Sequence, residues 1–347
     1  MTNATVVADA MTVEEFRTAT ERAAVFPSDA GRLRLTGEDA RDLINRLSTN
    51  LIDPAGESGE VAVTVLTSDR GRIVDLVYVV HCGDHQLLLT SPGQQQNVID
   101  FLDKYTIMEE LEVEDITGQT ILLTLTGPDA GEILGRAEHD DALVVEPPAN
   151  PDDGQRPPTY HLLIDDADAV SHIIAALESA GAVSISPATA ETLRIIQGRP
   201  AYGAEMSDTY NPLEAGLIGV IDFHKGCYIG QEVIARLDTY QKVQKYLVSL
   251  RFEADGAEAA GMAAALPGAR LADGEGKAVG LVTSATIVPR LDGAEAGAEA
   301  VGLGYVRTAA LQVGGKLAVE SDGGAGIVAE ITAQPLLFGG EKPAPGG

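Results

Sequence analysis

The chain has 347 residues, 45% of them hydrophobic, so it is long enough for two or three packed lobes and too apolar to be disordered throughout. Its 52 acidic residues outnumber its 24 lysines and arginines, and the resulting formal net charge of −28 argues against direct binding to the phosphates of nucleic acids. Acidic residues spread along the whole chain, together with few lysines and no tryptophan, are typical of a protein from a salt-rich cytoplasm. We therefore expect a halophilic source and low stability at low salt.

The two cysteines, Cys82 and Cys227, are far apart and lack the density of a disulfide scaffold, which favours a reducing compartment. The start of the sequence has no basic leader followed by an apolar segment, and no stretch approaches the length of a membrane span. A soluble, cytoplasmic protein without a membrane partner is the expectation.

The first part of the chain alternates between helix and strand patterns. Thr12 is placed as the N-cap of a short helix, with Glu15 three residues later. Hydrophobic periodicity then predicts strands at 33–35, 61–66, 73–80, 86–90 and 160–164 and helices at 39–47, 95–104 and 167–180. The proline-rich segment 146–159 reads as an exposed loop. This order predicts an α+β fold with mainly antiparallel pairing.

From Tyr246 onward the pattern changes to short strands at 247–252, 278–283 and 316–319, separated by loops rich in glycine, alanine and aspartate. This spacing predicts a small β-barrel. The expected division is a region of two α+β lobes over 12–240, a barrel domain over 246–336 and a disordered tail over 339–347.

The most informative motif is an octapeptide at 225–232. It is formed by Lys225, Gly226, Cys227, Tyr228, Ile229, Gly230, Gln231 and Glu232. The glycines predict a tight turn around Cys227, and the apolar spacing after it predicts a helix from Gln231. Helix amide dipoles and Lys225 would favour a thiolate that is nucleophilic or binds soft metals. The alternative is that Cys227 is a small buried hydrophobe in a turn.

This octapeptide resembles the signature of the YgfZ family, whose members look like the folate-binding T protein of glycine cleavage but serve iron-sulfur cluster maintenance. The resemblance extends from about residue 16 to 336 through the segments 47–50, 71–75, 125–128, 193–195, 211–217 and 280–284. It implies a three-lobed fold in which two α+β lobes and a C-terminal barrel surround a cleft. It also implies tetrahydrofolate or a derivative as the ligand of that cleft.

The resemblance also assigns candidate site residues. Asp75 occupies the place of the acid beside the reactive folate nitrogens, where a carboxylate can orient or accept a proton. Glu214 matches the glutamate that accepts hydrogen bonds from the pterin ring, with a buried salt bridge to Arg194 as the alternative. Lys245 stands where the T protein has an arginine and would contact the glutamate tail of the folate.

Other positions are less specific or depart from the T protein. Arg236 is a surface or site cation, Leu76 replaces a second acid, and Thr90 replaces an asparagine. The group formed by His81, Cys82 and His85 reads as a hairpin turn, and no metal site is expected.

Three functions follow from these motifs. The first is a YgfZ-type protein that binds tetrahydrofolate and uses Cys227 in iron-sulfur cluster assembly or repair, with assembly proteins or client enzymes as partners. The second is a tetrahydrofolate-dependent aminomethyltransferase, or a related demethylating enzyme, that uses Asp75 as acid or base. The third is a folate-storage or regulatory module without chemistry. Whether the chain is an enzyme depends on which of these holds.

Overall fold

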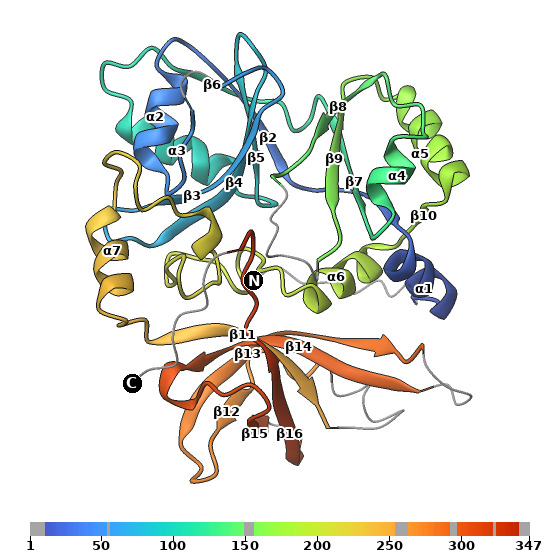
Figure 1. Ribbon diagram of the computed structural model, residues 1–347, viewed down its shortest axis with the longest axis vertical. Coiled ribbons are helices and arrows are strands. Elements are labelled where there is room, and N and C mark those ends of the chain that lie inside the picture. Colours follow the sequence, from blue (N-terminus) through green and yellow to red (C-terminus); the bar gives the residue numbers. More distant parts are fainter. Residues whose placement is uncertain are drawn as a thin grey trace.

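The computed structural model describes residues 11–53, 56–148, 156–253, 263–291, 297–321 and 324–339. Residues 149–155 of the predicted exposed loop and residues 340–347 of the predicted disordered tail lie outside these ranges. In Figure 1 two α+β lobes lie side by side, and a β-barrel lies below both of them.

The first lobe is an antiparallel sheet with two helices on one face. Its strands run in the order β3 (Val61–Thr67), β4 (Ile73–His81), β5 (Gln86–Thr90), β2 (Gly31–Thr36) and β6 (Glu112–Asp115). Helix α2 (Ala40–Leu47) buries Ala40, Leu43, Ile44 and Leu47, which are spaced to form one apolar stripe. This stripe and α3 (Gln95–Tyr105) pack against the sheet around Leu33. Strands β3 and β4 form an antiparallel hairpin.

The second lobe is a similar sheet, except that β10 pairs with β1 in parallel. Its strands run in the order β10 (Val183–Ser184), β1 (Ala24–Pro27), β7 (Ile121–Thr126), β9 (Thr159–Ile164) and β8 (Ala142–Val145). Helices α4 (Ala130–Leu134) and α5 (Ala169–Ala180) contribute Ile133 and Leu177 to the core on one side. Helix α1 (Val13–Glu21) begins with the predicted capping box, since Thr12 and Glu15 each bond the other's backbone.

The two sheets also pack against each other. Leu87 and Leu89 of the first lobe meet Leu122, Val145 and Leu163 of the second in one buried cluster. Each sheet is therefore covered on both faces. Its own helices cover one face, and the other lobe covers the opposite face. Apolar burial of this kind is the main force that holds the lobes together.

Helix α6 (Pro187–Ile196) was not predicted from the sequence. It begins at Ser186, whose side chain accepts a hydrogen bond from the Thr189 amide, and Pro187 occupies the first turn. Ile195 on this helix packs against Leu247 and Leu303 of the barrel. The remaining short elements are η1 (Ile218–Val220), α7 (Gln231–Thr239) and η2 (Thr308–Ala310).

A buried carboxylate, Glu205, joins α6 to the barrel. Its side chain is fully buried and accepts hydrogen bonds from Arg194 Nη1 (3.0 Å) and Ser284 Oγ (2.7 Å). Its backbone oxygen accepts one from the Tyr305 hydroxyl (2.7 Å). A buried charge is tolerated when it is paired and hydrogen-bonded in this way.

The predicted barrel is closed. Its strands run in the order β11 (Lys245–Phe252), β14 (Ala298–Arg307), β13 (Ala278–Pro289), β12 (Arg270–Ala272), β15 (Lys316–Ser321) and β16 (Gly324–Ala333). The chain enters it at Lys245.

After β16 the chain turns back from the barrel toward the two lobes (Figure 1). The Leu337 amide donates to the Gly216 carbonyl over 2.8 Å. Gly216 has a φ of +74°, and a Cβ there would lie 2.3 Å from the Pro335 carbonyl oxygen. Glycine at this position therefore lets the C-terminal segment lie close against the rest of the chain.

Within the described residues, none of the helices combines the length and the apolar character needed to cross a bilayer.

Candidate functional site

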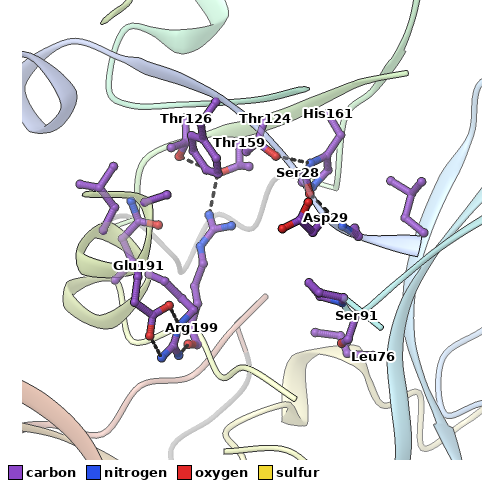
Figure 2. Close-up of a pocket in the computed structure, with 18 of the residues that line it drawn as sticks. Ser28, Asp29, Leu76, Ser91, Thr124, Thr126, Thr159, His161, Glu191 and Arg199 are labelled. Atoms are coloured by element: carbon purple, nitrogen blue, oxygen red, sulfur yellow. Dashed lines mark hydrogen bonds and ion pairs between the residues drawn. The ribbon is translucent and has the colours of Figure 1, made fainter. Parts of the chain in front are cut away.

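A cavity of about 630 Å³ lies between the two α+β lobes. Leu76 and Ser91 line it from the first lobe, and His161 of β9 lines it from the second (Figure 2). Glu191 on α6 and Arg199 just beyond that helix face them across the cavity (Figure 2). A cavity of this size is suited to a small organic ligand.

The predicted site residue Asp75 lies directly behind one wall of this pocket. Its side chain is fully buried, and its neighbour Leu76 reaches the pocket surface. The Asp75 carboxylate accepts hydrogen bonds from the amides of Leu76 and Ser91, both over 2.9 Å. Burial raises the pKa of Asp75 to about 6, and the hydrogen bonds oppose this rise. The carboxyl group can therefore gain or lose a proton near neutral pH.

Aromatic rings form part of the pocket lining. The rings of Tyr78 and His161 meet edge to face with centroids 5.3 Å apart, and Tyr78 meets Phe338 in the same way at 6.3 Å. His161 Nδ1 lies 3.1 Å from the Thr124 hydroxyl oxygen, which fixes the imidazole orientation. Burial, together with the charge of Arg199, lowers the pKa of His161 to about 4. His161 is therefore neutral at physiological pH.

The described lining also carries more positive than negative charge. Arg156, Arg194 and Arg199 line it, against the carboxylates of Asp29 and Glu191. Arg194 is held by Glu191 through two contacts of 2.7 Å. In a chain with a net charge of −28, this lining favours a ligand with an anionic group.

Cys227 lies outside the described lining of this pocket. It is exposed, in the loop between η1 and α7. Helix α7 begins at Gln231, as predicted, after Gly230 with a φ of +81°. In Figure 1, α7 stands at the outer edge of the first lobe, whereas α6 and the second lobe lie on the other side. The alternative of a buried cysteine is therefore wrong.

Lys225 has a structural role that the sequence did not reveal. Its ammonium group donates to the carbonyls of Asn45 (2.7 Å), Ser48 (3.0 Å) and Asn50 (2.5 Å), at and after the end of α2. All three of its protons are used in this way. Burial lowers the pKa of Lys225 to about 8. These contacts occupy the donors of the ammonium group, and the prediction that Lys225 favours a Cys227 thiolate stays a prediction.

The other motif residues mainly hold the loop in place. Tyr228 is buried, and the Ile229 amide donates to the Arg46 carbonyl over 3.0 Å. A Cβ at Gly230 would lie 2.4 Å from the Ser68 carbonyl oxygen, so only glycine fits there. Four further predicted motif residues lie nearer the surface. Gln231 is half-buried, and Gly226, Glu232 and Arg236 are exposed.

Glu214 and Lys245 lie together, but outside the described pocket lining. Glu214 is buried, accepts a hydrogen bond from the Asn211 amide (3.1 Å) and lies 3.7 Å from Arg72 Nη1. The suggested salt bridge to Arg194 is not formed, since Arg194 pairs with Glu191 and Glu205. The Lys245 ammonium lies 4.1 Å from the centroid of the Tyr210 ring.

Several pocket residues were not singled out from the sequence. His161 was counted only as part of a strand, and Glu191, Arg156 and Arg199 carried no recognised motif. The Ser186–Pro187 pair is a helix-start signal and could have placed α6, and with it Glu191, at the site.

Metal binding finds no support in the described part of the chain. No group of three or more potential ligands is close enough to hold an ion there. His81, Cys82 and His85 lie at the β4–β5 connection, as the hairpin interpretation predicted.

Comparison with known proteins defines the family. Residues 4–146 match the GCVT N-terminal domain. A chloroplast protein of Arabidopsis thaliana with a provisional transferase name is 32% identical over 320 residues, covering 88% of this chain and 69% of that protein. An aminomethyltransferase of a Picosynechococcus species is 27% identical over 337 residues, covering 91% and 86%.

The fold is also that of a solved structure. The glycine cleavage system aminomethyltransferase T from Bartonella henselae matches with a TM-score of 0.73 at 18% identity, covering 94% of this chain and 89% of that one. The predicted three-lobed fold is confirmed. The chain belongs to the GCVT family of aminomethyltransferase-like proteins.

Proposed function

We propose that this protein is a tetrahydrofolate-dependent one-carbon transferase that moves a carbon unit from an amine to the folate. The observation that carries the proposal is the position of Asp75, a carboxyl group with a pKa of about 6 behind the wall of a 630 Å³ pocket. The aminomethyltransferase names among its relatives favour the same chemistry.

The pocket residues fit a folate. Apolar and aromatic side chains, among them Leu76, Tyr78 and Phe338, suit a flat ring system. Arg156 and Arg199 provide positive charge for the carboxylates of the glutamate tail. The tail contact of Lys245 and the pterin contact of Glu214 stay predictions, since both residues, like Asp75, lie outside the described lining.

Bound tetrahydrofolate supplies the nitrogen atoms that accept the carbon. Bonds from the carbon to these nitrogens form while its bonds to the donor amine and the donor's carrier break, without net oxidation. The two folate N–H groups each give up a proton. Asp75 in its ionised form takes one and delivers it to the departing amine, and the other goes to the atom of the carrier that is released. A positioned acid or base of this kind contributes roughly 10²- to 10⁴-fold to a rate.

The test is a transfer assay with purified protein at high salt, tetrahydrofolate and an aminomethyl donor, followed by the appearance of methylenetetrahydrofolate. We expect Asp75→Asn to lower the rate by about 10²-fold or more. Asp208→Asn is the matched control. The charge of Asp208, like that of Asp75, raises the pKa of Tyr202, but Asp208 is exposed. Equal rates for wild type and Asp75→Asn would contradict the proposal.

A second candidate function is the YgfZ-type role in iron-sulfur cluster assembly or repair. It is favoured by Cys227, whose side chain is exposed, whereas Lys225, Tyr228 and Gly230 of the same motif are committed to packing and hydrogen bonds. One thiolate cannot hold a stable cluster alone, so a partner protein or external thiol would be required.

The two functions are separated in a deletion strain that is complemented with the wild type, Cys227→Ala or Asp75→Asn. Loss of iron-sulfur enzyme activity with Cys227→Ala alone supports the second candidate. If iron-sulfur enzymes are unaffected by the deletion itself, the second candidate is excluded.

A further inference from the structure

The C-terminal segment places a strained aromatic residue in the pocket. Phe338 has a φ of +57°, and Phe338 and Gln241 are the only residues other than glycine with a positive φ in the described chain. This conformation is unfavourable for a bulky residue because its Cβ crowds the backbone. Strained residues that persist in this way are concentrated at functional sites.

The backbone around Phe338 is held tightly on both sides. The preceding residue, Leu337, is bonded through its amide to Gly216. A Cβ at Gly219 would lie 2.3 Å from the Phe338 carbonyl oxygen, so glycine at 219 makes room for this turn. The surrounding structure therefore fixes Phe338 in its left-handed conformation.

The ring of Phe338 packs beside one wall of the pocket. It packs in the same cluster as Leu76, which follows Asp75 in sequence, and Met206. These three residues all line the pocket. The edge-to-face contact with Tyr78, with an interplanar angle of 76°, fixes the plane of the Phe338 ring. A flat ligand that lies against Leu76 would therefore meet this ring.

We propose that Phe338 is a specificity-determining residue that selects a planar ring beside Leu76, at the wall in front of Asp75. The inference rests on the proposed function in one respect, namely that the ligand is a folate whose pterin is that planar ring. The Phe338 ring contributes contact area and orientation and takes no part in proton transfer.

The test uses isothermal titration calorimetry with two probes, 5-formyltetrahydrofolate, which contains the pterin, and p-aminobenzoylglutamate, which does not. For Phe338→Leu we expect about tenfold weaker binding of the first probe and less than about a twofold change for the second. Phe338→Tyr keeps the ring and should bind both probes within about twofold of the wild type. Unchanged binding of 5-formyltetrahydrofolate by Phe338→Leu would overturn the assignment, as would an equal loss for both probes.

The outcome is distinct from failure of the proposed function. If the wild type binds no 5-formyltetrahydrofolate, the folate proposal fails and this inference falls with it. If the wild type binds and Phe338→Leu binds equally well, only the role of Phe338 is lost.

A melting comparison checks the strain separately. Phe338→Gly and Phe338→Ala both lose the ring, but only glycine relieves the left-handed backbone, so Phe338→Gly should melt roughly 2 °C higher. A melting temperature of Phe338→Gly at or below that of Phe338→Ala would overturn the strain argument.

Discussion

The amide of Ser91 donates a hydrogen bond to Oδ2 of Asp75 over 2.9 Å, joining the turn after β5 to the start of β4. Asp75 is fully buried, while Ser91 lies on the pocket surface. The contact therefore holds an ionisable carboxyl group just behind the ligand cavity. It also explains why Asp75 has a raised pKa that still lies within reach of neutral pH, since burial raises the pKa and the amides lower it.

Asp75 should make stability depend on pH. Its folded pKa of about 6 exceeds its usual value of 3.8, so its favourable contribution is complete below about pH 3.8 and is lost as the pH rises through about 6. The stability difference, defined as the free energy of unfolding of the wild type minus that of Asp75→Asn, should depend on pH. It should fall by roughly 2 kcal/mol between about pH 4.5 and pH 7.5. Urea unfolding at several pH values measures this difference. A difference that stays constant or rises would show that the Asp75 pKa is not raised.

Lys225 should be required for folding stability. Lys225→Met leaves three carbonyls at the end of α2 without their charged donor, and we expect a loss of roughly 2 to 4 kcal/mol in the free energy of unfolding. The exposed Lys242→Met is the matched control and should change it by less than about 0.5 kcal/mol. Similar unfolding midpoints for the two variants would mean that the Lys225 contacts contribute little.

The end of α7 offers a stabilising substitution. Gln241 has a φ of +50°, and the amides of Gln241 and Lys242 donate to the carbonyls of Asp238 and Leu237, which is the glycine-favouring Schellman arrangement. Gln241→Gly should raise the free energy of unfolding by about 0.5 to 1 kcal/mol. Gln244→Gly, where φ is not positive, should lower it. Thermal denaturation distinguishes the two, and a lower melting temperature for Gln241→Gly would contradict this account.

Salt should stabilise the protein. A net charge of −28 produces self-repulsion in the compact state, and added ions screen it. We expect the melting temperature to rise steadily in KCl between about 0.1 M and 2 M. Melting that does not depend on salt would remove the basis for a halophilic source.

The sequence predicted elements whose signals are local. Thr12 and Glu15 form the expected capping box, and strand β5 begins and ends at the predicted residues. The barrel could be predicted because short strands with glycine-rich loops have a recognisable spacing. These features depend on residues close together in the chain.

The site was only partly predictable because its residues come together through tertiary packing. Asp75 was predicted from a family motif, whereas the lining residues His161, Glu191 and Phe338 lie on segments far apart in sequence. Lys225 was expected to favour a thiolate at Cys227 because the two residues are neighbours in sequence. Its actual partners lie some 180 residues earlier, at the end of α2, and no local pattern reveals them.

The most direct test of the central claim is the pH dependence of one-carbon transfer by the wild type and Asp75→Asn. If Asp75 accepts the proton in its ionised form, the wild-type rate should rise about tenfold per pH unit below an apparent pKa of about 6 and level off above it. Asp75→Asn should be about 10²-fold slower or more on the plateau, without that inflection. The same inflection and rate in both proteins would contradict the assignment of Asp75 as the proton-transferring group.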